Sequence, residues 1–133
     1  MASILVVEDD PHNRELLVHW LQLKGYTVVI AIDGIEGLMR ARTVQPDLIL
    51  MDIGLPKLDG WQTIQRLKAS AATRAIPIIA LTAYALSEDR ARSIAVGCAD
   101  YETKPIDFAQ LAAKITYWLG GTRTSDGTAP LLG

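Results

Sequence analysis

The run Asp47-Leu48-Ile49-Leu50-Met51 stands near the middle of the chain, and Asp52 follows it directly. Consecutive apolar side chains without alternation are typical of a strand that is buried on both faces of a parallel sheet. Gly54, Pro56 and Gly60 come next, and residues of these types mark a loop. The segment therefore predicts a buried strand that leads into a carboxylate and then into a loop.

Strand-like and helical segments alternate on both sides of this run. Further strands are predicted over residues 3–7, 27–31, 76–81 and 100–103. Helical periodicity predicts five helices, over residues 11–24, 34–43, 61–69, 87–97 and 108–119. Such alternation favours an α/β domain whose parallel sheet is doubly wound, with helices on both faces.

Helical spacing also predicts which side chains face the core. In the segment 34–43, we expect Ile35 and Met39 to face inward together with Leu38. In the segment 11–24, Leu16 belongs to the predicted apolar stripe. These positions follow from periodicity alone.

The composition is that of one small domain. The chain has 133 residues, 50% of them hydrophobic, and 13 basic side chains against 15 acidic ones. We expect a domain over residues 1–119 and a flexible tail over 120–133, where Gly, Thr, Ser and Pro replace any periodic pattern. Cys98 is the single cysteine, which excludes an internal disulfide.

Charge and hydropathy exclude several classes of partner. No basic block is present, so direct binding of nucleic acid is not expected. No apolar stretch reaches the roughly 18–20 residues that a membrane span needs, and no leader is apparent. The expected location is therefore the cytoplasm, with no membrane partner.

Polar residues follow several of the predicted strands. Glu8, Asp9 and Asp10 follow the first strand, Asp52 follows the third, Thr82 the fourth, and Lys104-Pro105 the fifth. In open parallel sheets, ligands bind beyond the carboxyl ends of the strands. We therefore expect these side chains to converge on one crevice.

The expected cluster favours chemistry between a cation and a phosphoryl group. Glu8, Asp9 and Asp52 would repel one another unless a cation lay among them. Carboxylate oxygens select Mg²⁺, Mn²⁺ or Ca²⁺ over Zn²⁺. Lys104 supplies a point charge that suits a phosphoryl group, and Thr82 supplies a hydrogen-bond donor. An aspartate in this setting can serve as a covalent phosphoryl acceptor.

Four segments, in this order, resemble the receiver domain of two-component response regulators, the family that includes the bacterial chemotaxis regulator. They are Val6-Val7-Glu8-Asp9-Asp10, the loop from Asp52 to Gly60, Leu81-Thr82-Ala83, and Tyr101-Glu102-Thr103-Lys104-Pro105. The resemblance covers residues 3–119. It implies a flavodoxin-like fold of five parallel strands in the order 2-1-3-4-5, with five helices.

The resemblance also implies a metal site. Asp52 would be the phosphorylated residue and a metal ligand. Asp9 would bind Mg²⁺ directly, Glu8 would act through a coordinated water, and the Gly54 carbonyl would be a further ligand, with Mn²⁺ as the alternative ion. Asp10 is assigned to the start of the following helix.

Further residues correspond to the phosphoryl pocket and the switch of the family. Lys104, Thr82 and the small residue Ala83 would contact the phosphoryl group. Thr82 and Tyr101 would move together on activation, and the Lys104–Pro105 peptide bond would be cis.

The resemblance implies partners rather than a separate substrate. A sensor histidine kinase or a phosphotransfer protein would donate to Asp52, and the phosphorylated form would bind a downstream protein. The only expected chemistry is self-phosphorylation and self-dephosphorylation, in a stand-alone chain that is a monomer or a weak dimer.

Other functions place different demands on the same residues. A flavodoxin-like FMN carrier would need a hydroxyl- and glycine-rich phosphate loop where Glu8, Asp9 and Asp10 stand, and a Rossmann dehydrogenase would need the pattern G-x-G-x-x-G there. A phosphatase that uses an aspartyl phosphate would need a second aspartate where Gly54 stands. A DNA-binding regulator whose output domain lies outside this sequence remains open.

Overall fold

The computed structural model describes residues 2–55, 58–83 and 87–120. The strands are β1 (Ser3–Val7), β2 (Thr27–Ala31), β3 (Leu48–Asp52), β4 (Ile78–Thr82) and β5 (Asp100–Thr103). The helices are α1 (Pro11–Leu23), α2 (Gly34–Val44), α3 (Gly60–Ala69), α4 (Ser87–Val96) and α5 (Phe108–Trp118). The strictly alternating order predicted from the sequence is confirmed.

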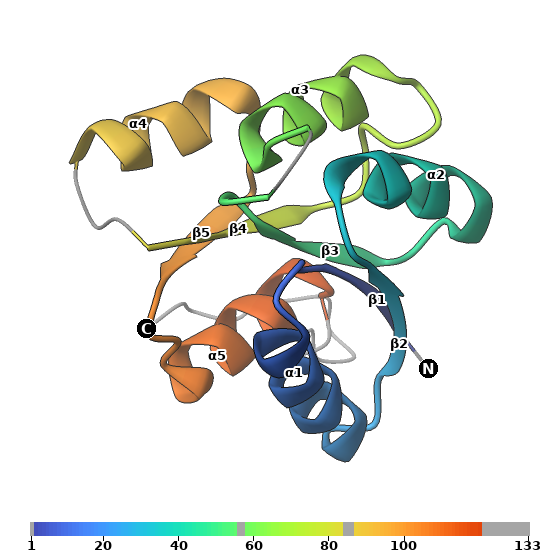
Figure 1. Cartoon of the computed structure of the whole chain (residues 1–133), viewed down its shortest axis with the longest axis vertical. Helices are drawn as coiled ribbons and strands as arrows, with labels where there is room; N and C mark the ends of the chain where they lie inside the picture. The colour runs from blue at the N-terminus through green and yellow to red at the C-terminus, as the bar shows by residue number, and fades with distance from the viewer. Residues whose placement is uncertain (1, 56–57, 84–86, 121–133) are drawn as a thin grey trace.

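All five strands are parallel and lie in the order β2-β1-β3-β4-β5. Helices α1 and α5 cover one face of the sheet, and α2, α3 and α4 cover the other (Figure 1). The central strand β3 is buried at every position. The doubly wound, flavodoxin-like sheet is therefore confirmed, with β2 and β5 at its edges.

Two apolar cores lie on the two faces of the sheet. Along β3, Ile49 and Met51 belong to one core, while Leu48 and Leu50 belong to the other. This alternation is the ordinary period of a strand, and it explains the unbroken apolar run in the sequence. Asp52 is the last residue of the strand, at the carboxyl edge of the sheet.

Two strands end one residue later than predicted. Asp52 is the last residue of β3 and Thr82 is the last residue of β4. The backbone N–H of Ile53 still donates to the Leu81 carbonyl at 3.0 Å, and that of Lys104 donates to Thr82 at 2.7 Å. These bonds hold the functional side chains in strand geometry, whereas the sequence placed them in loops.

Aspartates cap four of the helices. Asp10, Asp33, Asp59 and Asp107 each accept hydrogen bonds from the first turn of α1, α2, α3 and α5, respectively. An N-cap carboxylate satisfies backbone donors that have no partner inside the helix. The assignment of Asp10 to the start of a helix, rather than to the acidic pair, agrees with this geometry.

Helix α2 presents only part of the predicted face to the core: Leu38 is buried as predicted, but its two predicted neighbours are not. Ile35 and Met39 are 50% and 62% exposed, and in α1 Leu16 is 52% exposed, so these three inward assignments are wrong. Beside Leu38, helix α2 packs closely through small residues: a Cβ added to Gly37 would lie 3.1 Å from the side chain of Val7. Close approach through glycine rotates the apolar stripe toward solvent.

Most of the predicted tail, residues 121–133, lies outside the described residues. Within the described ranges, none of the helices combines the length and the apolar character that crossing a bilayer requires.

We predict that Gly60→Ala destabilises the fold more than Gly54→Ala. A Cβ at Gly60 would lie 2.5 Å from the Asp52 carbonyl oxygen, whereas one at Gly54 would lie 3.9 Å from the nearest atom, Asp52 Oδ1. Forcing atoms into such a contact costs about 1–3 kcal/mol. Urea unfolding of both variants measures the difference, and equal midpoints would contradict the prediction.

Candidate functional site

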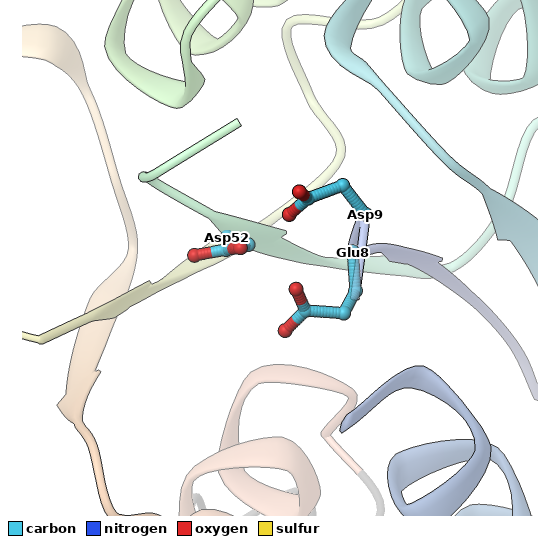
Figure 2. A group of neighbouring side chains, drawn as sticks. All are labelled: Glu8, Asp9 and Asp52. Carbon is cyan, nitrogen blue, oxygen red and sulfur yellow. The ribbon is translucent and has the colours of Figure 1, made fainter. Parts of the chain in front are cut away.

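An acidic cluster lies at the carboxyl edge of the sheet. Glu8 and Asp9 follow β1, and Asp52 ends β3. The three side chains lie close together (Figure 2), and one carboxylate oxygen from each lies within 4.8 Å of the others. The structure therefore brings together the three carboxylates that the sequence singled out.

Burial differs across this cluster. Glu8 is 1% exposed and Asp52 is 5% exposed, while Asp9 is exposed to solvent. Two ionised carboxylates at such depth are unfavourable without a compensating cation. The cluster therefore has a buried floor and an open side through Asp9.

Lys104 supplies the positive charge. Its Nζ lies 3.1 Å from Asp52 Oδ1 and 3.3 Å from Glu8 Oε1. Burial on its own would lower the pKa of Lys104, but the charges of Asp52 and Glu8 outweigh that effect and the pKa is raised. Lys104 therefore remains an ammonium that bridges the two buried carboxylates.

The proton affinity of Glu8 is unusually high. Burial, together with the adjacent Asp52 carboxyl, raises the pKa of Glu8 from 4.5 to about 7. The charge of Lys104 and the backbone N–H of Asp10, which donates to Glu8 Oε2 at 3.3 Å, act in the opposite direction. Lys104 alone therefore does not compensate the negative charge of the buried carboxylates.

The cluster forms the floor of a cleft of about 400 Å³. Its lining residues are Glu8, Asp9, Asp10, Asn13, Asp52, Ile53, Gly54, Trp61, Thr82, Ala83 and Lys104. All the predicted metal and phosphoryl-binding positions are among them. Tyr101 is not: it lies half-buried on β5 and packs against the core on the α3 side.

Backbone groups also shape the cleft. The Gly54 N–H donates to Asp52 Oδ1 at 3.2 Å, which orients that carboxylate. The Lys104–Pro105 peptide bond is cis. Pro105 belongs to the neighbouring groove rather than to the cleft itself.

Two contributors were not found from the sequence. The guanidinium of Arg14 donates to the carbonyls of Glu8 at 3.0 Å and Asp9 at 3.3 Å, which holds the acidic turn. Trp61 is only 6% exposed and lines the cleft, and Arg92 of α4 lies 4.9 Å from the centre of its ring. Residue spacing in the sequence predicts neither contact, because both depend on how the turns and helices pack.

The donor set of the cleft fits a hard divalent cation. Glu8, Asp9 and Asp52 offer only oxygen ligands, and the open side at Asp9 leaves room for water. Mg²⁺ typically takes one or two carboxylates and retains several waters. The raised pKa of Glu8 also indicates that the buried carboxylates need more positive charge nearby than Lys104 provides.

We predict that the titration of Glu8 lowers stability as pH rises in metal-free buffer. Between pH 4.5 and about 7 the folded chain retains a proton on Glu8 that the unfolded chain has lost. The folded state then binds more protons, so the free energy of unfolding falls with rising pH across this window.

Glu8→Gln removes this titration while keeping the shape of the side chain. Its free energy of unfolding should therefore improve relative to wild type as pH rises from 4.5 to about 7. Denaturant titrations at several pH values in a chelator measure the difference. A constant difference between the two proteins would show that Glu8 does not titrate as stated.

Most of this chain is similar in sequence to known proteins. Residues 4–116 match the profile of the response regulator receiver domain. DivK, a polar-differentiation response regulator of Brucella anthropi, is 38% identical over 118 residues, which cover 89% of this chain and 96% of DivK. RpaA of Synechocystis, a DNA-binding dual master transcriptional regulator, is 40% identical over 115 residues, or 86% of this chain. The chain spans about half of RpaA, 48%.

A solved structure of similar sequence has the same fold. The receiver domain of the sensor histidine kinase PA1611 from Pseudomonas aeruginosa is 39% identical, with a TM-score of 0.83 over 90% of this chain and 98% of that one. That domain holds a magnesium ion in its active-site cleft. Together with the profile match and the sheet order, these likenesses show that the chain belongs to the response regulator receiver domain family.

Proposed function

We propose that this chain is a phosphorylation-driven switch of two-component signalling, with Asp52 as the phosphoryl acceptor. The observation that supports this most directly is the position of Asp52. It lies at the floor of the cleft, where Lys104 Nζ contacts one of its oxygens and the carboxylates of Glu8 and Asp9 lie beside it. A nucleophilic carboxylate, a metal site and a phosphoryl-binding ammonium thus share one cavity.

The metal site would be held by Asp9, by Asp52 and by the backbone carbonyl of Gly54, with Glu8 acting through a water. Mg²⁺, or Mn²⁺ in its place, would neutralise charge on the transferring phosphoryl group. Asp52 Oδ would attack the phosphorus of a phosphohistidine; the new P–O bond forms as the P–N bond breaks, and the imidazole leaves. Catalysis on the side of this chain is then positioning and charge.

The conformational switch would be driven by the negative charge that phosphorylation adds to Asp52. Phosphorylation adds about −1.5 to −2 charges at Asp52. Lys104 is already in contact with Asp52, and the buried hydroxyl of Thr82 lines the same cleft beside Ala83. A hydrogen bond from Thr82 to a charged phosphoryl oxygen would favour one conformation by about 1.5–3 kcal/mol. Tyr101, on the neighbouring strand β5, would change position with Thr82.

The donor would dock beside the cleft. A groove of about 510 Å³ adjoins it, lined by Glu8, Asn13, Leu16, Leu17, Lys104, Pro105, Ile106 and Phe108. Leu16, an exposed apolar residue of this groove, offers a contact for a helix of the sensor histidine kinase or of a phosphotransfer protein. The output would be binding of a downstream protein, with no separate enzymatic substrate.

The place of this domain in a signalling pathway is a further part of the proposal. Segments similar to this chain occur in the response regulator DivK, in the longer regulator RpaA and in the receiver domain of the sensor kinase PA1611. We assign residues 1–119 to the receiver and 120–133 to a tail or linker. The DNA binding of RpaA belongs to that protein by name, and the proposal for this chain stops at the receiver.

We predict that acetyl phosphate and Mg²⁺ add one phosphoryl group to this protein, and that Asp52→Asn abolishes the addition. Intact-mass spectrometry measures it, and base lability identifies an acyl phosphate. Asp10→Asn is the matched control, because Asp10 caps α1, and it should be labelled like wild type. Thr82→Ala should also be labelled but should lose most of the change in NMR shifts at Tyr101 and Lys114.

Labelling that persists in Asp52→Asn would refute the assigned acceptor. If Thr82→Ala kept the full pattern of shifts, the acceptor would stand and the switch role of the hydroxyl would be wrong. The two parts of the proposal are thus tested separately.

We also predict that Mg²⁺ stabilises the protein through Asp9. A ligand at 100 times its Kd stabilises the folded state by about 2.7 kcal/mol. Asp9→Asn should lose most of the Mg²⁺-dependent rise in melting temperature. Asp10→Asn should keep it, because asparagine is also an effective N-cap. The reverse order in thermal melts would show that Asp10, not Asp9, faces the ion.

A further inference from the structure

The edge strand β2 lacks the features that usually protect a sheet edge. Thr27-Val28-Val29-Ile30-Ala31-Ile32 contains no charge, no proline and no glycine. It is rich in β-branched residues, and among residues 2–55, 58–83 and 87–120 the strand β2 has a neighbour only on the β1 side. Proteins normally protect such an edge with lysine, proline, a bulge or a covering segment.

The backbone pattern shows which residues of β2 face outward. The N–H of Thr27 donates to Ala2 at 3.0 Å and the carbonyl of Ala31 accepts from Glu8 at 3.1 Å, so these two residues face β1. Backbone direction alternates along a strand. Val28 and Ile30 therefore direct their N–H and C=O groups away from the sheet.

Internal bonds close both flanks of this short open segment. The N–H of Ile32 donates to Glu36 Oε1 at 3.1 Å, and that of Tyr26 donates to the Leu21 carbonyl at 3.2 Å. In the described part of the chain, no bond is made by the outward groups of Val28 and Ile30. The open edge is thus two residues long, and that length restricts the register of any strand that could pair with it.

Exposed apolar side chains flank this edge on both faces of the sheet. Ile30 is 40% exposed and lies against α1, while Ile35 and Met39 on α2 are 50% and 62% exposed. Ile32, at the end of the strand, is 47% exposed. These are the side chains that glycine packing of α2 and the edge position leave in solvent.

Charges on the flanking helices are self-complementary. Glu36 and Arg40 lie one turn apart on the outer face of α2, beside Met39. Glu15 and His19 have the same spacing on α1, beside Ile30. A helix that runs antiparallel to an identical one brings each acidic residue opposite the basic or imidazole residue of the other. Such an arrangement is what a two-fold axis produces.

We propose that the β2 edge pairs with β2 of a second copy of this chain, with the strands antiparallel and Val29 on the two-fold axis. Val28 of each copy then lies opposite Ile30 of the other, and their backbone groups exchange hydrogen bonds in both directions. The two sheets join into one, α2 lies beside α2 of the second copy, and α1 lies beside α1.

This interface is independent of the acidic cleft. The cleft lies at the carboxyl ends of the strands, and antiparallel pairing directs the two clefts to opposite ends of the joined sheet. Both remain open to a phosphoryl donor. Dimerisation should therefore be insensitive to Mg²⁺, to acetyl phosphate and to Asp52→Asn. The proposed interface can thus be tested separately from the proposed function.

Sedimentation velocity of the full chain over a concentration series tests the interface. Wild type should form dimers, and Ile30→Lys should raise the dimer Kd by about tenfold or more, because it buries a charge at the edge. Ile94→Lys is the matched control: Ile94 is 70% exposed on α4 and should leave the Kd unchanged. A monomer at all concentrations, or loss of the dimer in Ile94→Lys alone, would overturn the proposal.

Charge reversal tests the register. Arg40→Glu and Glu36→Lys should each weaken the homodimer, whereas an equimolar mixture of the two variants should form a heterodimer. Hydrogen exchange of wild type gives a measurement that needs no variant: the amides of Val28 and Ile30 should slow with concentration, while amides of β5 should not. Uniform exchange at both edges, or failure of the mixture to associate, would overturn the antiparallel β2 pairing.

Discussion

The ammonium of Lys104 is the interaction on which the carboxyl edge of this sheet depends. It lies between Asp52 and Glu8, at 3.1 and 3.3 Å, and both carboxylates are nearly inaccessible to solvent. Glu8 follows β1, Asp52 ends β3 and Lys104 follows β5, so the positive charge reaches the two carboxylates only when the sheet is complete. Even then positive charge is lacking, and the pKa of Glu8 rises to about 7. This electrostatic deficit is what makes the cleft receptive to a divalent cation.

The rest of the fold holds this cluster at a defined depth. Strand β3 is buried on both faces and carries Asp52 to the boundary between core and cleft. The segment after it returns to the sheet at Gly60, which packs directly against the backbone of Asp52 and Ile53. Thr82 is held at the same level by the bond between its carbonyl and the N–H of Lys104. The site is thus built on strand ends, and the hydrogen bonds between neighbouring strands restrict the positions of these ends.

The two edges of the sheet differ in how their polar groups are satisfied. At the β5 edge, Lys114 Nζ donates to the Tyr101 carbonyl at 2.7 Å and to Glu102 at 2.9 Å, and Trp118 Nε1 donates to Asp100 at 3.1 Å. Charges that could have faced a partner are paired within the chain. At the β2 edge, the exposed side chains are mostly apolar. This contrast supports β2 as the surface that accepts a second copy.

The sequence by itself determined the order of elements, the buried character of β3 and the identity of the residues that meet at the cleft. Short-range patterns carry this information, because strand and helix periodicities are local and parallel strands align their carboxyl ends. Only the tertiary structure decided that α2 packs through Gly37, with Met39 in solvent, and that Arg14 and Trp61 shape the site. Helix rotation and side-chain approach depend on the surfaces that meet, and no periodicity within one segment encodes the shape of its neighbour.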